Sequence, residues 1–275
     1  EARTGLTREE EAYRKTLIEY GIPRSATKRQ TMTKPYNSKQ RSCFEYTLEW
    51  VVKQEKKGLV APDLGLNAEG NPLGTTFKMA QFLSSAIWEA IERVAPKPCE
   101  AMKWIEDITK IAVNARPQAP LQWSLPDGMV CVIDKQKQDA ARIDTRINGS
   151  IVGQRVRVDN GTQDARKHGN AAPPNFVHSL DALHLREAAR MWEDQCAAQG
   201  RKAIFTFVHD SFGVPAADMP EFHKCIRAAF VKLYTEYDLL GGFIECMQEI
   251  AGPDVVFPER PALGSLDITG VLDSE

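Results

Sequence analysis

The sequence lacks several features that mark secreted, membrane-spanning or metal-binding chains. None of its apolar runs reaches the roughly 18 residues that a membrane-spanning helix needs, and its N-terminus has no apolar signal-peptide core. Its cysteines, at positions 43, 99, 131, 196, 225 and 246, form no CxxC pair or other metal-ligand spacing. This pattern favours reduced, mostly buried thiols in a cytosolic setting, without disulfides. The chain begins at Glu1 rather than Met, as a processed, trimmed or partial chain would.

A strong net charge is also missing. Lys and Arg number 35 against 37 Asp and Glu, which gives a formal net charge of −2. Any nucleic-acid surface must therefore be local, and a local excess of basic residues lies between Thr27 and Lys57. With 275 residues, 43% hydrophobic and 26% charged, the chain can bury a core as one large domain or two small ones.

The most informative basic stretch is RSATKRQTMTKPYN, at residues 24–37. If its first ten residues are helical, two long cations lie one turn apart on one face, because side chains four residues apart are neighbours on a helix. Such a face suits a polyphosphate, which guanidinium and ammonium groups bind, and an aromatic hydroxyl at the helix end could contact a sugar or base. A solvated basic helix would show the same spacing. The residues on or beside this face are Arg24, Lys28, Arg29, Met32 and Tyr36.

Helical periodicity dominates the first 115 residues and returns near the C-terminus. Thr7 is a good N-cap with Glu10 three residues later, and Pro35 should stop or kink the basic helix. Glycine, proline and asparagine indicate a loop at 58–74, and a polar loop is predicted at 159–174. The predicted helices cover 7–20, the basic stretch, a segment through 44–51, 76–114 with a break at 96–98, 175–196, and most of 218–250.

Between Leu121 and Val158 the pattern becomes strand-like. Pro126-Asp127-Gly128 is a turn signal, and IVGQRVRV at 151–158 alternates apolar and basic residues, which predicts a β-hairpin. In a DNA groove, Arg can bond two acceptors of guanine and Asn can pair with adenine. An exposed hairpin whose arginines face water would look the same. The candidate DNA contacts are Arg146, Asn148, Arg155 and Arg157.

A second candidate site lies in AIFTFVHDSFG, at residues 203–213. A β-prone run that ends in His209-Asp210 predicts a carboxylate at the tight turn of a hairpin, where an oxygen ligand could hold Mg²⁺. Mg²⁺ is usually held by one or two carboxylates together with phosphate oxygens and water, so this hypothesis requires a partner aspartate and a triphosphate. A turn-forming Asp would give the same local pattern.

Taken together and in this order, the stretches resemble motifs B and C of the single-subunit, phage-type DNA-dependent RNA polymerases. The resemblance covers nearly the whole chain. It implies an α+β fold with mostly helical fingers, a small antiparallel palm sheet and a β-hairpin. The fingers would occupy 1–120, a specificity-type hairpin with its following loop 121–172, and the C-terminal palm 173–275. The matching blocks are Tyr20-Gly21 with Arg24, Thr27-Lys28-Arg29 with Met32-Thr33, Pro126-Asp127-Gly128, Pro174-Asn175-Phe176-Val177-His178-Ser179 and Val208-His209-Asp210-Ser211-Phe212-Gly213.

The resemblance also implies roles for single residues in the transfer of a nucleotide from an NTP to an RNA 3′ end. The phosphates would be bound by Arg24, Lys28 and Arg29. Tyr36, with His178, would monitor the ribose 2′-hydroxyl. Asp210 would be one of two aspartates that hold two Mg²⁺ ions, and His209 would support the primer-end site. Arg146 and Asn148 fall where the family's specificity hairpin reads promoter bases. The implied partners are promoter and template DNA, nascent RNA and NTPs, in the cytoplasm of an infected bacterial host.

The chain departs from the family pattern in several places. No stretch before Arg24 resembles motif A, which carries the other catalytic aspartate, and the N-terminal promoter-opening region is also missing. We expect a second polypeptide or a preceding segment to supply both. Tyr36 is flanked by Pro35 and Asn37, where the family prefers Gly after the Tyr. The C-terminus lacks the aromatic ending of phage members, and Val158 stands where a polar base-reading side chain is expected.

Two other kinds of protein share parts of this pattern. Family A DNA polymerases share the Arg, Lys and Tyr spacing, but usually carry Glu after the His-Asp, where this chain has Ser211. A chain without motif A could also be a non-catalytic DNA-binding or clamp-like module. A partner that carries the missing aspartate would separate a catalytic chain from a binding module.

Overall fold

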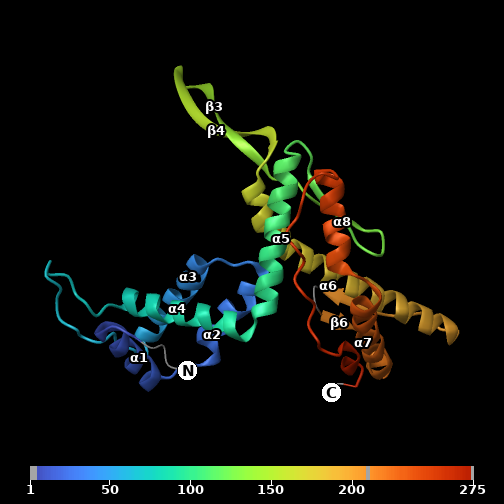
Figure 1. The fold of residues 1–275 in the computed structure, drawn as a ribbon, viewed down its shortest axis with the longest axis horizontal. Helices are drawn as coiled ribbons and strands as arrows, with labels where there is room; N and C mark the ends of the chain where they lie inside the picture. The colour runs from blue at the N-terminus through green and yellow to red at the C-terminus, as the bar shows by residue number, and fades with distance from the viewer. Residues whose placement is uncertain (1–4, 209–210, 274–275) are drawn as a thin grey trace. The chain divides into compact units, whose positions relative to one another are not determined.

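The computed structural model describes residues 5–208 and 211–273. Its backbone packing divides the chain into two compact units, residues 1–102 and 103–275, and each is described here by itself. Across the described residues, helices dominate and the strands pair into three separate two-stranded antiparallel sheets (Figure 1). The predicted α+β class, with a mostly helical N-terminal part and small antiparallel sheets, is confirmed.

The first unit is helical. Its elements are α1 (Arg8–Tyr20), α2 (Arg24–Thr33), the 3₁₀ helix η1 (Lys34–Tyr36), α3 (Gln40–Glu55) and α4 (Thr76–Val94), and α5 (Pro96–Ala115) runs from this unit into the next. The predicted capping box is present, because the Glu10 backbone N–H donates to Thr7 Oγ1 at 3.2 Å and the Thr7 N–H donates to Glu10 Oε2 at 2.9 Å. The helix at residues 7–20 is therefore confirmed to within one residue.

The core of the first unit forms where α1, α2 and α3 pack against α4. Its largest buried side chains include Leu17 from α1, Trp50 from α3, and Met79 and Leu83 from α4. These positions recur at helical spacing, so each helix buries one stripe and leaves the opposite side in water. The Tyr13 hydroxyl donates to the carbonyl of Leu73 at 2.7 Å and ties the end of the 58–74 loop to this core.

Among the described residues, the second unit contains the strands and five more helical segments after α5. Its elements are β1 (Leu121–Ser124), β2 (Val130–Ile133), β3 (Gln136–Ile147), β4 (Ser150–Gln163), α6 (Ala165–Ala198), β5 (Thr206–Val208), β6 (Ser211–Gly213), the 3₁₀ helix η2 (Ala216–Asp218), α7 (Met219–Glu236), α8 (Leu239–Ala251) and the 3₁₀ helix η3 (Ile268–Val271). The predicted helix at 218–250 is in fact two helices, because Asp238 caps α8 by accepting the Gly241 N–H at 3.0 Å.

The prediction of a polar loop at 159–174 was wrong. Strand β4 continues to Gln163, Asp164 caps α6 by accepting from the Arg166 and Lys167 backbone N–H groups, and the helix runs on through Pro173 and Pro174. A proline inside a helix costs about 3 kcal/mol or more through its missing donor and its steric clash. Buried residues on both sides of the prolines offset this cost: His168, Gly169 and Ala172 before them, and Phe176, Leu180 and Leu183 after them.

An aromatic cluster holds the middle of the second unit together. The rings of Trp123 on β1, Phe176 on α6 and Phe243 on α8 have centroids 4.7 to 6.4 Å apart, within the range of favourable edge and tilted contacts. The Trp123 indole N–H donates to Ser179 Oγ at 3.2 Å, so the buried ring is also hydrogen-bonded. None of the helices in the described part of the chain is long and apolar enough to span a membrane.

Candidate functional site

The predicted basic helix is α2, and its two faces differ sharply. Ala26 and Gln30 are buried, at 0% and 3% exposure, and Gln30 Nε2 donates to Thr47 Oγ1 on α3 at 3.0 Å. Arg24 and Lys28 lie on the exposed side. Within the described residues, neither of these two side chains forms an ion pair or a side-chain hydrogen bond. The helix therefore presents two cations, one turn apart, to solvent.

Arg29 differs from its two basic neighbours. Its guanidinium pairs with Glu49 at 3.1 Å and lies 3.8 Å from the ring centroid of Tyr46, and both partners are on α3. These contacts combine an ion pair with a cation–π interaction and hold Arg29 against the protein. Its assignment to phosphate binding stays a prediction, whereas Arg24 and Lys28 are the cations without a protein partner among the described residues.

The end of α2 explains the asparagine that follows Tyr36. Asn37 has φ +63° and ψ +27°. This is the left-handed conformation, which glycine adopts most readily and asparagine next most readily. Its N–H donates to the carbonyl of Lys34 at 3.0 Å, and the Ser38 N–H donates to the carbonyl of Thr33 at 3.2 Å. These two bonds form a Schellman motif, which closes the helix end at Tyr36. Asn37 thus meets the conformational demand of this position in place of a glycine, and Tyr36 is 38% exposed beside it.

Sequence reasoning missed Lys34, which precedes Pro35 and Tyr36. Its side chain is 5% exposed and pairs with Glu92 at 2.9 Å. No spacing rule identifies it, because its partners lie on α4, far along the chain. Pro35 does not end the helical course of the backbone. The α-helix ends at Thr33 and continues as the single 3₁₀ turn η1, where a proline in the first turn is tolerated.

The strand pair predicted around residues 203–213 is β5 with β6. The predicted metal ligand Asp210 and its neighbour His209 lie outside the described residues, and the strands on either side pair with Val208 opposite Ser211 and Phe207 opposite Phe212. Gly213 faces Thr206, and a Cβ at this glycine would lie 2.8 Å from the Thr206 methyl carbon. The close cross-strand approach therefore favours glycine after Phe212.

Helices α6 and α7 hold this strand pair from one side. Phe207 and Phe212 have ring centroids 5.4 Å apart, and both lie within 6.4 Å of the Phe222 ring on α7. His184 on α6 lies 5.8 Å from the Phe212 ring, and its Nε2 is 2.8 Å from the Ile226 carbonyl. The strands that flank His209 and Asp210 thus rest on a packed aromatic layer. His178, the other predicted histidine, is exposed two turns before His184 on α6.

The predicted hairpin is β3 with β4, and it carries its arginines on one face. Opposed residues of an antiparallel pair share a face, and alternate residues of a strand share a face. Arg142 is opposite Arg155, Ala140 is opposite Arg157, and Arg146 is opposite Ile151. The four arginines therefore line the same side of an almost fully exposed ribbon. Arg142 is partly neutralised, because it pairs with Asp144 at 2.7 Å.

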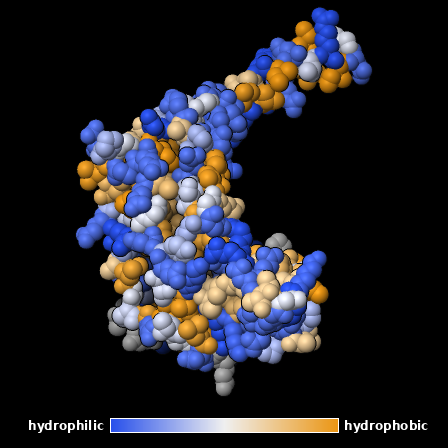
Figure 2. Space-filling view, turned by 90° about the vertical axis from the view of Figure 1, so that its right-hand side faces the viewer, coloured by the Kyte–Doolittle hydropathy of each residue, from blue (hydrophilic) through white to orange (hydrophobic). Residues whose placement is uncertain are grey.

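The other face of this hairpin is largely apolar. Ile143, Ile147, Val152 and Val158 alternate with the arginine-bearing positions and are 43% to 57% exposed. Figure 1 shows the hairpin extending away from the helices of its own unit, and Figure 2 shows apolar and polar side chains interspersed on it. Val158, the predicted departure, belongs to this apolar face, on the opposite side from Arg155 and Arg157.

Asn148 occupies the turn of the hairpin rather than either face. Asn148 and Gly149 have φ of +50° and +83°, and they connect the paired residues Ile147 and Ser150. A two-residue Asn-Gly turn with positive φ at both positions is the preferred connection for twisted strands. The backbone thus explains an asparagine at this position. The predicted base contact of Asn148 is untested.

The base of the hairpin is held by Gln163 and His168. Gln163 is 4% exposed, and its side chain donates to Asp134 Oδ1 at 2.9 Å and accepts the Lys135 N–H at 3.2 Å. His168 is fully buried, with Nδ1 2.9 Å from the Asp164 carbonyl and Nε2 3.1 Å from the Ile133 carbonyl. Neither residue belongs to a recognisable sequence pattern, so only the fold reveals them.

The Pro126-Asp127-Gly128 block joins β1 to β2 and is fastened to α6. Asp127 forms an ion pair with Arg186 and accepts the Met129 N–H at 3.2 Å. Burial alone would raise the pKa of Asp127, but the hydrogen bonds from Arg186 and from Met129 outweigh it and hold the pKa below its ordinary value. This third block therefore has a structural role in the second unit.

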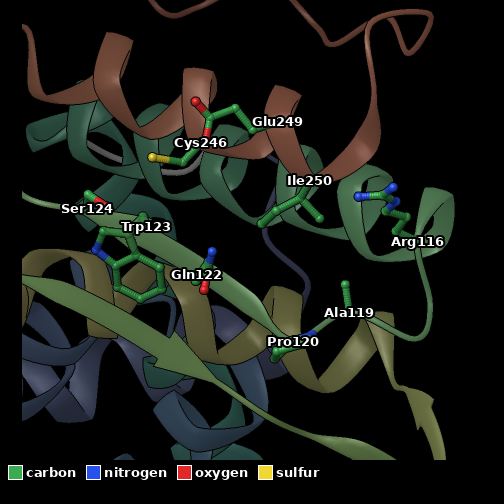
Figure 3. A pocket seen from close by; sticks show the side chains of 9 residues that line it. All are labelled: Arg116, Ala119, Pro120, Gln122, Trp123, Ser124, Cys246, Glu249 and Ile250. Carbon is green, nitrogen blue, oxygen red and sulfur yellow. The ribbon is translucent and has the colours of Figure 1, made fainter.

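The cysteines and cavities add no site to these candidates. All six cysteines are free thiols, and burial raises the pKa of those at positions 43, 99, 131 and 225, which disfavours the reactive thiolate. A cavity of about 230 Å³ is lined by the segment that follows α5, by β1 and by α8, and Arg116 and Glu249 are among its lining residues (Figure 3). It contains none of the predicted site residues. In the part of the chain that the structure describes, no three His, Cys, Asp or Glu side chains are grouped to hold a metal ion.

The structure thus groups the predicted residues into separate sets. Arg24 and Lys28 share one face of α2, with Tyr36 at the end of that helix. Arg146, Arg155 and Arg157 share one face of the hairpin. Tyr36 and His178 belong to different units, so their predicted proximity is untested.

The family model and the similar known proteins agree on one family. The family model described as DNA-dependent RNA polymerase matches residues 2–252. T7 RNA polymerase of Escherichia phage T7 is 28% identical over 276 residues, and the DNA-directed RNA polymerase of Enterobacteria phage K11 is 26% identical over 273 residues. Each match covers 94% of this chain but 29% of the relative. The chloroplastic DNA-directed RNA polymerase 3 of Nicotiana sylvestris is 32% identical over 173 residues, which cover 63% of this chain and 16% of that protein.

Proposed function

Because the chain belongs to the DNA-dependent RNA polymerase family, of the phage type, we propose that it carries the nucleotide-binding helix and the C-terminal catalytic strands of a template-directed RNA polymerase. The reaction would transfer a nucleotide from an NTP to an RNA 3′ end, with promoter and template DNA as partners. The chain spans 29% of the length of the phage relatives. The complete activity would therefore also need the motif A aspartate, from a second polypeptide or a preceding segment.

The observation that supports this proposal most directly is the pair of unpartnered cations on α2. Arg24 and Lys28 are exposed, one turn apart, on a helix whose opposite face is fixed by Ala26 and Gln30. Preorganised cations stabilise the charge that develops on phosphate oxygens during phosphoryl transfer, because they need no rearrangement when the reaction occurs. Tyr36 would contact the ribose from the end of the same helix, together with His178.

The proposal assigns one carboxylate of this chain, Asp210, to Mg²⁺, with His209 beside it. Carboxylate oxygen is a ligand that Mg²⁺ prefers, and the ion usually completes its shell with phosphate oxygens and water. Bound Mg²⁺ would neutralise charge on the triphosphate. No three metal-ligating side chains are grouped within the described residues, and the proposal assigns the second aspartate of a two-metal site to a second polypeptide or a preceding segment.

The hairpin would contribute promoter contacts. Its arginine face suits a DNA groove or the phosphates that border it, because guanidinium groups bond both guanine acceptors and phosphate oxygens. Arg146, Arg155 and Arg157 would make these contacts, and Asn148 would reach a base from the turn.

The test replaces Asp210 and Lys28 in the native protein or assembly that contains this chain. Asp210→Asn should abolish RNA synthesis and leave promoter-DNA binding nearly unchanged. Lys28→Ala should lower kcat/KM for NTPs about 10- to 100-fold, the worth of a charged hydrogen bond. Lys15→Ala on α1, which removes another exposed cation of the same unit, is the matched control and should change neither measurement. Near-normal synthesis by Asp210→Asn would refute the catalytic assignment.

A further inference from the structure

Lys34 is a buried cation at the end of α2 that the proposed catalytic roles do not use. Its Nζ donates to the carbonyl of Trp88 at 2.9 Å, pairs with Glu92 Oε1 at 2.9 Å, and lies 3.6 Å from the centroid of the Trp88 ring. Trp88 and Glu92 are four residues apart on α4 and so share one face. A buried ammonium is costly unless it is paired and hydrogen-bonded. The three contacts satisfy that demand and anchor the end of α2 to α4.

The backbone at Lys34 gives this anchor a specific task. Lys34 has φ −63° and ψ −44°, which is helical, although it precedes Pro35. The ring of a proline disfavours the helical region for the residue before it, because the ring contacts that residue's backbone and Cβ. Lys34 is therefore held in a conformation that its neighbour opposes. The side-chain contacts with α4 stabilise that conformation.

The position of Tyr36 depends on the same turn. Tyr36 lies between Pro35 and Asn37, and the Asn37 N–H closes the turn on the carbonyl of Lys34 at 3.0 Å. If the Lys34 backbone moved toward the extended conformation that a following proline favours, that carbonyl would rotate. The turn would open, and the tyrosine ring would leave its place at the helix end.

We propose that Lys34 is a positioning residue for sugar selection: its anchor to Trp88 and Glu92 holds Tyr36 where it meets the ribose of the incoming nucleotide. This proposal deepens the proposed function and rests on the assignment of Tyr36 to the ribose. It predicts that removal of the anchor changes the choice between NTP and dNTP, and that relief of the proline constraint repairs it. A purely structural role for Lys34 predicts neither effect.

The experiment measures the ratio of kcat/KM for an NTP to that for the matching dNTP, in the native polymerase that contains this chain. Lys34→Met keeps most of the side-chain volume and removes the charge, and the ratio should fall about tenfold, the worth of one hydrogen bond to a charged group. Adding Pro35→Ala removes the opposing steric contact. The double variant should recover a ratio within about threefold of the wild-type ratio.

Two further variants and two controls complete the design. Glu92→Gln keeps both Trp88 contacts and should lower the ratio less than Lys34→Met does, so it tests the anchor even if Lys34→Met fails to fold. Lys78→Met breaks an ion pair of 3.6 Å between α4 and Glu9 and should leave the ratio unchanged. Ile91→Val, which removes one buried methyl group at a cost of about 1 kcal/mol, should also leave it unchanged, because general destabilisation does not act on Tyr36.

The outcomes separate this inference from the proposed function. Tyr36→Phe should weaken discrimination against dNTPs with the rate largely kept. If Tyr36→Phe lowers the ratio but Lys34→Met and Glu92→Gln do not, the positioning role is overturned and the function of Tyr36 stands. If the double variant stays as low as Lys34→Met, the relief of Pro35 is irrelevant and the inference is again overturned. An unchanged ratio in Tyr36→Phe overturns both assignments.

Discussion

The ion pair of Asp127 with Arg186 makes a testable contribution to the stability of the second unit. It fastens the turn between β1 and β2 to α6, and the two side chains are only 18% and 34% exposed. One guanidinium nitrogen of Arg186, Nη2, is already buried without a partner among the described residues. Asp127→Asn keeps the shape and the acceptor for the Met129 N–H but removes the charge. The substitution therefore leaves a largely buried cation without its counter-ion.

The magnitude follows from this partial burial. Hydrogen bonds to charged groups contribute about 1.5–3 kcal/mol, and exposed ion pairs contribute less than about 1 kcal/mol because water screens them. Since Arg186 is about one-third exposed, the lower end of the first range applies. We expect Asp127→Asn to lower the free energy of unfolding by about 1.5 kcal/mol at pH 7.

The pH dependence has a definite sign. The folded-state pKa of Asp127 lies below its ordinary value, so the charged form is favoured in the folded protein. The contribution of the pair is fully present above the unfolded-state pKa and is lost as the pH falls through the folded-state pKa. The difference in stability between the wild type and Asp127→Asn should therefore begin to shrink as the pH falls below about 4, the unfolded-state pKa.

The assay is urea unfolding of both proteins at pH 7, 5 and 3.5, with amide hydrogen exchange of β1 and β2 to localise the loss. The matched control is Asp144→Asn, which breaks the exposed Arg142–Asp144 pair of the hairpin and should cost less than about 0.5 kcal/mol. The reasoning fails if Asp127→Asn costs nothing at pH 7. It also fails if the cost at pH 3.5 equals the cost at pH 7, because the ion pair would then not be its source.

Two further predictions concern the helix end and the hairpin. Asn37→Ala should lower the free energy of unfolding by about 1 kcal/mol, because alanine tolerates φ +63° poorly, whereas Asn37→Gly should stay near the wild-type value. Thermal or urea unfolding measures both, and equal losses would contradict the left-handed conformation at this position. Arg146→Ala should change promoter preference in transcription from promoter variants. A uniform loss, with the salt-dependence slope of DNA binding reduced by about one, would instead mean that Arg146 contacts a phosphate. Arg142→Ala is the control on the same face and should have the smaller effect, because Asp144 already neutralises Arg142.

The parts of the fold that the sequence predicted are those with local signals. The capping box at Thr7 and Glu10, the cation spacing on α2 and the alternation at 151–158 each depend on residues within one or two turns of one another. Local hydrogen bonds and periodicity are sufficient to specify such elements. The family resemblance rested on the order of these local blocks, and the family model over residues 2–252 confirms it.

The predictions that failed concern parts of the fold that depend on contacts between residues far apart in the sequence. Paired prolines at 173 and 174 are a strong local stop signal, yet α6 passes through them because buried residues on both sides outweigh the cost. Lys34 resembles any other lysine of a basic stretch until α4 supplies Trp88 and Glu92. No local pattern in a single sequence identifies partners that lie so far along the chain. The site roles of Arg24, Lys28 and the hairpin arginines stay predictions.

The hairpin shows how a local signal can control a distant property. Side chains alternate between the two faces of a strand, so a shift of one residue in the pairing would move every arginine of one strand to the opposite face. The Asn148-Gly149 turn fixes the pairing of Ile147 with Ser150, and the register that follows places Arg155 and Arg157 on the face that Arg146 shares. The turn residues therefore determine the electrostatics of the whole ribbon, even if neither of them touches DNA. If an Asn148 variant impairs DNA binding, its strand register must therefore be measured before the loss is assigned to a base contact.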